Sequence, residues 1–167
     1  MESSDLENRL EALHDESFAW ARACCSGNPA EAEDVLQTVY LLIMQQKARF
    51  GGQAEFKTWL FAVIRNQSAK EMRRQVMRRL FQLRQESVPP SRARALPPDA
   101  CVEQTERAKA FQAALDALPR RQREVLHLVF YEDLTIAAAA QVMGVSVGTA
   151  RQHYERGKAK LRQDLQS

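Results

Sequence analysis

The chain has 167 residues, of which 45% are hydrophobic and 27% charged, and its 24 Lys and Arg against 21 Asp and Glu give a formal net charge of +3. No window approaches the roughly 18 to 20 consecutive apolar residues of a membrane helix, and residues 1–16 are too acidic and polar for a secretory signal, which predicts a cytoplasmic protein. Three cysteines, the adjacent Cys24 and Cys25 and the distant Cys101, do not make the framework of a disulfide-stabilised protein.

The charge is unevenly distributed along the chain. Residues 1–50 hold four basic and nine acidic side chains, residues 51–86 hold eight and three, and residues 145–167 hold five and two. Two basic segments and one acidic segment predict two surfaces that meet a polyanion and one that meets a different partner. Solvated helix faces are the alternative explanation of each charged run.

Apolar side chains recur three and four residues apart almost everywhere, which predicts an all-α fold. A first helix is expected over residues 6–24, and a second over residues 30–50, where a pair of glycines ends it. On one side of the second helix two apolar side chains stand beside acids, which favours a protein-binding surface over a DNA-binding one, because phosphate would be repelled. Plain solvent exposure is the alternative. The residues on that side are Glu33, Asp34, Gln37, Leu41 and Met44.

A third, long helix is predicted from about residue 55 toward residue 83, with Trp59, Leu60, Val63 and Ile64 turned inward. Phe56 and Trp59 could stack on unpaired bases of single-stranded DNA, or both rings could belong to the core. The other side of the helix is polar and basic along several turns, so it could follow a phosphate backbone. It consists of Lys57, Arg65, Asn66, Lys70, Arg73 and Arg74.

Residues 85–104 are predicted to be a linker, because four prolines interrupt the helical pattern and favour an extended, stiff path. Two small helical domains, residues 1–84 and 105–167, are expected on either side of it. In the second domain a helix is predicted over residues 105–118. The next helix has Pro119 near its start and is expected to bury Val125, Leu126, Val129 and Phe130.

Residues 135–163 have the layout of a helix-turn-helix. Thr135 can cap a short helix, Gly144 can adopt the left-handed conformation of a tight turn, and Ser146 can cap the next helix. Ala139 and Ala140 would let the two helices approach closely. The inner face of the second helix is predicted to contain Val145, Val147, Ala150, Tyr154 and Leu161.

The outer face of that second helix is polar, and it could read base edges and phosphates in a major groove. An αα-hairpin whose charges only keep it soluble is the alternative. The outer residues are Arg151, Gln152, Glu155, Arg156 and Lys158.

Four motifs occur in a fixed order along the chain: AEDVLQTVY at residues 32–40, FKTWLFAVIRN at 56–66, LPRRQREVL at 118–126 and GVSVGTAR at 144–151. The first two, with Arg73 and Arg74, resemble region 2 of bacterial RNA polymerase sigma factors of the sigma-70 family, and the last two resemble region 4. The combination is similar to the extracytoplasmic-function (ECF) subfamily, which retains only these two regions.

The resemblance implies a sigma factor that binds core RNA polymerase, directs it to promoters and helps to open the duplex. The clamp helices of the largest polymerase subunit would meet Asp34, Gln37 and Leu41. The loop of residues 51–55 would shape a pocket for an extruded base. The melted downstream (−10) element would contact Phe56, Lys57, Trp59, Arg65, Asn66, Lys70, Arg73 and Arg74.

The same resemblance implies that the upstream (−35) element is read as duplex by Thr149, Arg151, Gln152, Glu155 and Arg156. The linker would lie in the polymerase channel, and an anti-sigma factor would restrain the free protein. Three features depart from the family pattern: alanines at residues 137–140, the pair Gln152-His153, and Thr38 in place of an acid. Promoter preference and the strength of core binding therefore do not transfer directly.

No cofactor, bound metal or enzymatic activity is expected. His14, His127 and His153 have no metal-ligand spacing with one another or with the cysteines, and no phosphate loop or nucleophile motif occurs. Two alternatives to a sigma factor stay open at this point: a stand-alone helix-turn-helix regulator that binds duplex DNA as a dimer, and a helical adaptor that binds proteins.

Overall fold

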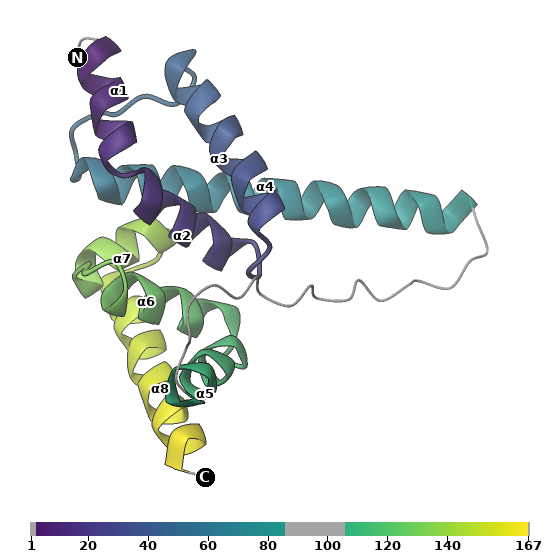
Figure 1. Ribbon diagram of the computed structural model, residues 1–167, viewed down its shortest axis with the longest axis vertical. Helices are drawn as coiled ribbons and strands as arrows, with labels where there is room; N and C mark the ends of the chain where they lie inside the picture. Colours follow the sequence, from purple (N-terminus) through teal and green to yellow (C-terminus); the bar gives the residue numbers. More distant parts are fainter. Residues whose placement is uncertain (1–2, 86–105, 167) are drawn as a thin grey trace. The chain divides into compact units, whose positions relative to one another are not determined.

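The computed structural model describes residues 3–85 and 106–166, and all regular structure in this part of the chain is helical, as the apolar spacing predicts (Figure 1). The chain divides into two compact units. One comprises Met1–Arg49 and Val63–Pro98, and the other comprises Phe50–Ala62 and Asp99–Ser167. Of the predicted linker, only Gln85 lies within the described residues, and it is the last residue of a helix.

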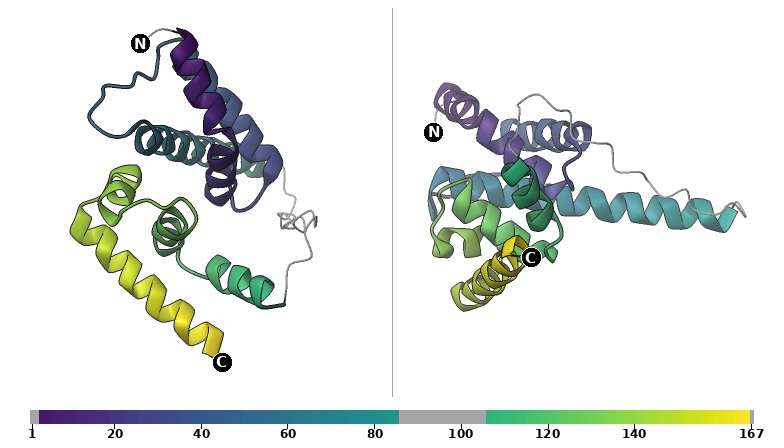
Figure 2. Two further views of the ribbon diagram at one scale, coloured as in Figure 1. Left: turned by 60° about the vertical axis from the view of Figure 1, so that its left-hand side comes forward. Right: turned by 60° about the horizontal axis from the view of Figure 1, so that its bottom comes forward.

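The first unit contains α1 (Ser3–Ala12), α2 (His14–Cys24), α3 (Pro29–Met44) and the part of α4 (Phe56–Gln85) that begins at Val63. Asn28 caps α3, because its Oδ1 accepts hydrogen bonds from the backbone N–H groups of Ala30 (3.1 Å) and Glu31 (3.3 Å). α2 and α3 pack against each other (Figure 2). Their buried apolar side chains, which repeat at helical spacing, are Trp20, Ala21, Cys24, Ala32, Val35, Leu36, Val39 and Ile43.

Two helix bounds in this unit differ from the prediction. The helix expected over residues 6–24 is broken at Leu13, whose φ of −103° and ψ of 9° lie outside the helical range. No Gly or Pro stands at this break, so the spacing of apolar residues did not predict it. The helix expected over residues 30–50 ends at Met44, because Gln46 adopts a left-handed φ of 55° and the Leu42 carbonyl accepts from the N–H groups of Lys47 (2.8 Å) and Ala48 (3.0 Å).

α4 is one continuous helix of 30 residues, close to the predicted span. The expected core residues Leu60 and Ile64 are completely buried, and so is Phe61, which the sequence pattern did not place inside. Trp59 and Val63 are half-buried rather than enclosed. The helix therefore presents its buried residues in its first half.

The second unit contains α5 (Glu106–Asp116), α6 (Arg120–Phe130), α7 (Ile136–Met143) and α8 (Val147–Gln166), together with the segment Phe50–Ala62. α8 packs against α5, α6 and α7, and α6 also packs against α7. Pro119 is the N-cap residue of α6. The buried apolar side chains of these helices and their connections include Leu115, Leu118, Val125, Leu126, Leu128, Leu134, Val142, Met143, Ala150 and Leu161.

The helix-turn-helix forms as the capping residues predict. Thr135 Oγ1 accepts a hydrogen bond from Ala138 N–H at 3.1 Å, and Gly144 adopts the left-handed conformation with φ 65° and ψ 37°. Ser146 Oγ accepts from Thr149 N–H at 3.1 Å and starts α8. The Thr135 bond thus caps the start of α7, while the left-handed Gly144 and the Ser146 bond define the turn between α7 and α8.

A buried glycine allows the close approach of α8 to α6. A Cβ atom on Gly157 would lie 2.8 Å from Leu126 Cδ1 and 3.3 Å from Gln122 Cβ, so a larger residue would displace the core. Ala139 and Ala140, the small residues that the sequence identified, are also buried. Gly157 belongs to the same packing arrangement, although no turn signal in the sequence marks it.

Two residues that the apolar pattern predicts to be buried are exposed. Phe130 is 51% exposed and Val147 is 44% exposed. Phe130 is the last residue of α6 and Val147 the first residue of α8. The helical repeat continues to these ends, but neighbouring helices do not cover them.

Candidate functional site

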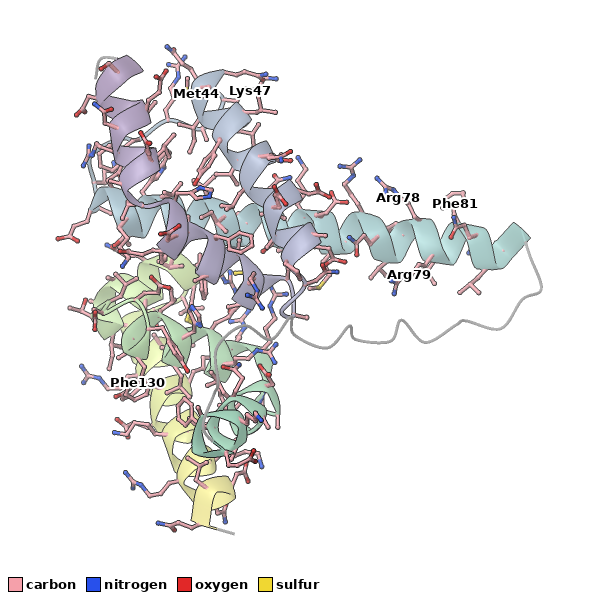
Figure 3. All side chains as sticks on the ribbon, viewed as in Figure 1. Met44, Lys47, Arg78, Arg79, Phe81 and Phe130 are labelled. Carbon is pink, nitrogen blue, oxygen red and sulfur yellow. The ribbon has the colours of Figure 1, made fainter. Side chains whose placement is uncertain are left out.

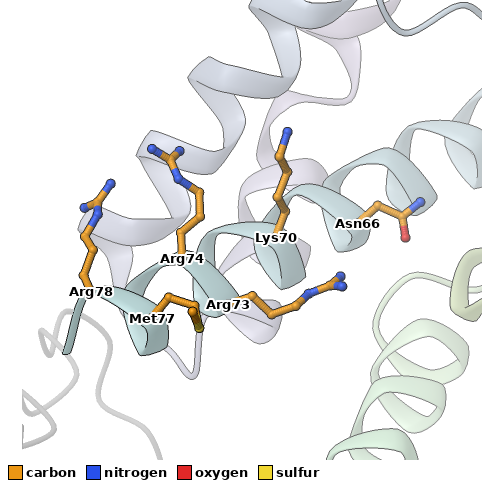
Figure 4. A pocket seen from close by; sticks show the side chains of 6 residues that line it. All are labelled: Asn66, Lys70, Arg73, Arg74, Met77 and Arg78. Carbon is orange, nitrogen blue, oxygen red and sulfur yellow. The ribbon is translucent and has the colours of Figure 1, made fainter. Parts of the chain in front are cut away.

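A basic groove runs along α4 in the first unit. Figure 4 shows Lys70, Arg74 and Arg78 pointing in the same direction, with Met77 and Arg73 beside them. Arg74 Nη1 lies 3.2 Å from Glu71 Oε2 in an exposed ion pair, which contributes little stability. With Asn66, these residues line the groove, and the structure thus brings together the predicted track over residues 66–74 and extends it to residue 78.

Aromatic rings at the start of α4 form a cluster in the second unit. The ring centroids of Phe50, Phe56 and Trp59 are 5.4 Å apart in each pair. Phe56 is only 5% exposed, so its ring belongs to the core of this cluster, whereas Trp59 is half-buried. Trp59 is therefore the more accessible of the two rings for a base.

Lys57, another predicted DNA contact, is engaged by the loop between α6 and α7. Its Nζ donates a hydrogen bond to the Glu132 carbonyl at 2.9 Å and lies 3.4 Å from the carboxylate Oε2. Glu132 is buried, and its Oε1 is also 3.3 Å from His127 Nε2. Lys57 also lies over the Phe61 ring at 5.4 Å. In this structure Lys57 is thus not an open cation, and no sequence pattern marks Glu132 as its partner.

The outer face of α8 is uncovered at its N-terminal half, as predicted. Arg151, Gln152, Glu155 and Arg156 are exposed. Thr149 is half-buried, and its Oγ1 lies 2.8 Å from Ser146 Oγ in the helix cap. The recognition face therefore offers two guanidinium groups, an amide and a carboxylate at the end of the helix that follows the turn.

The outer face of α3 is also uncovered. Asp34 and Gln37 are exposed, and Leu41 is 58% exposed, the first of two large apolar side chains on this face. Met44, labelled in Figure 3, is the second, at 45%. Because residues three and four apart share one side of a helix, the three predicted polymerase contacts form a continuous strip.

Tyr40, which is also on α3, contacts a histidine of α2. Its hydroxyl lies 3.2 Å from His14 Nδ1. Burial raises the pKa of Tyr40 above its ordinary value, while the Ser17 hydroxyl opposes this shift. The pKa of Tyr131 is also raised, by burial and by the Asp116 carboxylate. Both phenols are thus neutral at pH 7 and act as packing and hydrogen-bonding groups.

Within residues 3–85 and 106–166, no three His, Cys, Asp or Glu side chains gather closely enough to hold a metal ion. None of the helices in this part of the chain is long and apolar enough to cross a membrane. Cys24 and Cys25 are both buried.

Comparison with known proteins identifies the two regions. The family model for Sigma-70 region 2 matches residues 10–78, and that for Sigma-70, region 4 matches residues 108–161. The chain is similar to the ECF RNA polymerase sigma factor EcfG of Rhodopseudomonas palustris (strain TIE-1), with 31% identity over 139 residues that cover 81% of this chain and 72% of the relative. It is 28% identical to the ECF RNA polymerase sigma factor SigX of Bacillus subtilis (strain 168) over 138 residues, which cover 81% and 71%.

Solved structures show the same fold. The sigma factor RpoE from Bartonella quintana, in complex with the anti-sigma factor NepR, matches with a TM-score of 0.67 and 22% identity and covers 97% of each chain. CnrH, in complex with the cytosolic domain of CnrY, matches with a TM-score of 0.60 and 22% identity over 95% of this chain and 86% of that one. The chain belongs to the ECF RNA polymerase sigma factors of the sigma-70 family, which confirms the family and function predicted from its motifs.

Proposed function

We propose that this sigma factor binds core RNA polymerase through α3, holds the melted downstream promoter element against the groove of α4, and reads the upstream element as duplex with α8. The observation that carries the proposal is that one chain presents both a basic groove on a long helix and an exposed recognition face on a helix-turn-helix. The predicted regions, residues 1–84 and 105–167 with a linker over 85–104, supply one surface for each DNA element.

The polymerase surface is the strip of Asp34, Gln37 and Leu41 on α3. An exposed leucine next to an acid is poorly suited to DNA, because phosphates repel the carboxylate. It is well suited to a protein groove, where the apolar side chain is buried and the polar neighbours form the rim. We assign this strip to the clamp helices of the largest polymerase subunit.

The downstream element binds along α4. Lys70, Arg73 and Arg74 neutralise phosphates of the strand, so binding through the groove depends on salt. Trp59, which is half-buried, offers a ring face to an unpaired base. Because such contacts favour the unpaired strand over the duplex, they shift the equilibrium toward the open promoter. The assignment extends to Arg65 and Asn66. Phe56, whose ring is buried, supports Trp59 from the core instead of meeting a base, and Lys57 reaches DNA only in competition with Glu132.

The upstream element binds to α8. Arg151 and Arg156 can donate to base edges or phosphates, and Gln152 can form paired hydrogen bonds with adenine. Glu155 can accept from cytosine, and Thr149 positions the start of the helix through its contact with Ser146. This arrangement is the usual one for the second helix of a helix-turn-helix in a major groove.

A solved relative points to a further partner. RpoE from Bartonella quintana was solved with the anti-sigma factor NepR, and we extend an anti-sigma partner to this chain. The linker, which lies outside the described residues, is assigned to the polymerase channel. We place the protein in the cytoplasm, where the polymerase is.

Run-off transcription with purified core polymerase tests the proposed function. Templates are first selected from a random pool by the combined proteins, and each component is then omitted in turn. Specific transcripts that require both the core enzyme and this chain support the proposal. A chain that fails to bind the core enzyme, and instead protects duplex sites alone, is a stand-alone regulator and contradicts it.

A further inference from the structure

The end of α4 continues past the segment that the family model matches. The Sigma-70 region 2 match ends at residue 78, whereas the helix runs on to Gln85. From residue 76 to residue 84 every side chain is exposed. Phe81, at 63%, is the most exposed of the large hydrophobic side chains in the described part of the chain. An aromatic ring so exposed on a helix is available for a partner.

The charge around this ring favours a polyanion. After Glu71, α4 carries no Asp or Glu, and its arginines are Arg73, Arg74, Arg78, Arg79 and Arg84. A second copy of this helix would be repelled by like charge. The phosphates of a nucleic acid would neutralise these arginines, and the neighbouring groove is already assigned to a DNA strand.

Phe81 lies on the groove side of the helix. At about 100° per residue, it falls close to the direction of Met77 and Arg78, four and three positions earlier, and of Arg74, seven positions earlier. Figure 3 shows Arg78 and Phe81 projecting on the same side of α4 and Arg79 on the opposite side. Leu83, which is 45% exposed, points almost directly away from Phe81. The ring thus continues the row that begins at Lys70, about 16 Å away along the helix axis.

We infer that Phe81 stacks on an unpaired base of the promoter strand held in the α4 groove, and so extends the binding site by about one helical turn beyond the segment that the family model matches. This inference rests on the proposed function. Arginines hold the phosphates while the ring offers an apolar face, which is the arrangement that proteins use for single strands. A paired base inside a duplex offers no free face to the ring, so the contact is specific to the melted strand.

The test uses holoenzyme assembled from core polymerase and a promoter selected by the wild-type protein. Binding is measured to the duplex promoter and to the same promoter premelted, for Phe81→Ala, Phe81→Leu and Phe81→Trp, with Leu83→Ala as the matched control. Phe81→Ala should weaken binding to the premelted template by about tenfold, the range of one stacked base, and leave duplex binding unchanged. Phe81→Trp should restore the affinity, and Phe81→Leu should not.

A spectroscopic readout locates the base. 2-Aminopurine is placed at successive positions of the unpaired strand, and its fluorescence is quenched where it stacks. Quenching at one position that disappears only with Phe81→Ala and Phe81→Leu supports stacking. Equal losses with Leu83→Ala, full rescue by leucine, or a loss of core binding rather than DNA binding overturns the inference. A wild-type holoenzyme that opens no promoter contradicts the proposed function instead.

Discussion

At the residue scale, Lys57 shows how a predicted DNA contact can be occupied by the protein itself. Its ammonium group is 3.4 Å from a carboxylate oxygen of Glu132, which is buried, and 2.9 Å from the carbonyl of the same residue. A phosphate must compete with this acid for the same cation. We therefore expect Glu132 to weaken any contribution of Lys57 to DNA binding by the free protein.

Glu132→Gln should raise the affinity of the free protein for premelted promoter DNA. The amide keeps the size of the side chain and removes the charge that holds Lys57, so the expected gain is roughly two- to fivefold, the size of a partly exposed ion pair. Fluorescence anisotropy with a labelled template measures it. Asp133→Asn, an exposed neighbour with the same change in charge, is the control, and an equal gain there would show that only net charge matters.

Gly157→Ala should lower the free energy of unfolding. The new methyl group would meet Leu126 Cδ1 at 2.8 Å in a completely buried region. Overpacking of this kind costs about 1–3 kcal/mol, which exceeds the ~1 kcal/mol that alanine gains over glycine in a helix. Urea unfolding followed by circular dichroism measures the difference.

Gly148→Ala is the matched control for this change. The nearest atom to a Cβ at Gly148 is Ser146 Oγ at 3.9 Å, an ordinary contact, so this variant should be as stable as the wild type or more so. If Gly157→Ala were also as stable as the wild type, the close approach of α8 to α6 would not require glycine.

At the scale of elements, α8 has one face buried in the core and another that is exposed and polar. Ala150, Gly157 and Leu161 face the core, and the exposed polar residues between them face outward. Thr135 caps the start of α7, and the left-handed Gly144 with the Ser146 cap sets the direction in which α8 leaves the turn. The residues of the turn thus position the exposed polar face of α8.

Arg151→Ala should weaken recognition of the upstream element by about 1–3 kcal/mol if the guanidinium contacts a base. The loss should be greatest for one base pair of the element, because a base contact is specific to sequence. Holoenzyme binding to a set of single-base promoter variants measures it. Arg162→Ala, also exposed but farther along α8, should show no sequence dependence. A uniform loss across all variants would make Arg151 a phosphate contact.

At the scale of the whole molecule, the small net charge of +3 is the remainder of an acidic segment and two basic ones. Acidic residues accompany the exposed leucine of α3, and cations line α4 and the outer face of α8. On the proposed function these are separate surfaces, so we expect that polymerase binding and DNA binding can be changed independently.

Leu41→Glu should therefore abolish transcription by removing core binding, with little effect on folding. Truncation of a central apolar contact commonly costs 2 kcal/mol or more, and a buried charge adds to this loss, so core affinity should fall by roughly 30-fold or more. Co-purification with core polymerase measures it, and circular dichroism checks the fold. Ala30→Glu introduces the same charge at an exposed site in the first turn of α3. Equal defects in both variants would argue against the α3 strip.

The sequence by itself determined the all-α class, the long α4 helix, the helix-turn-helix and the family, because apolar spacing, caps and turn residues act locally. It also identified the exposed strips on α3 and α8. Only the structure decided the break at Leu13 and the early end of α3, because no Gly or Pro at these positions marks the change of backbone conformation. It also decided the exposure of Phe130, which depends on which neighbours cover a helix end.

The same limit applies to the candidate site. Asn66, Lys70, Arg73 and Arg74 on α4 follow from helical spacing, and so they could be predicted residue by residue, whereas Arg78 was added only by the structure. The pairing of Lys57 with Glu132 joins residues 75 positions apart, and the packing of Gly157 on Leu126 joins two helices. A one-dimensional pattern records which side of a helix a residue occupies. What lies opposite that side is decided only when the chain folds.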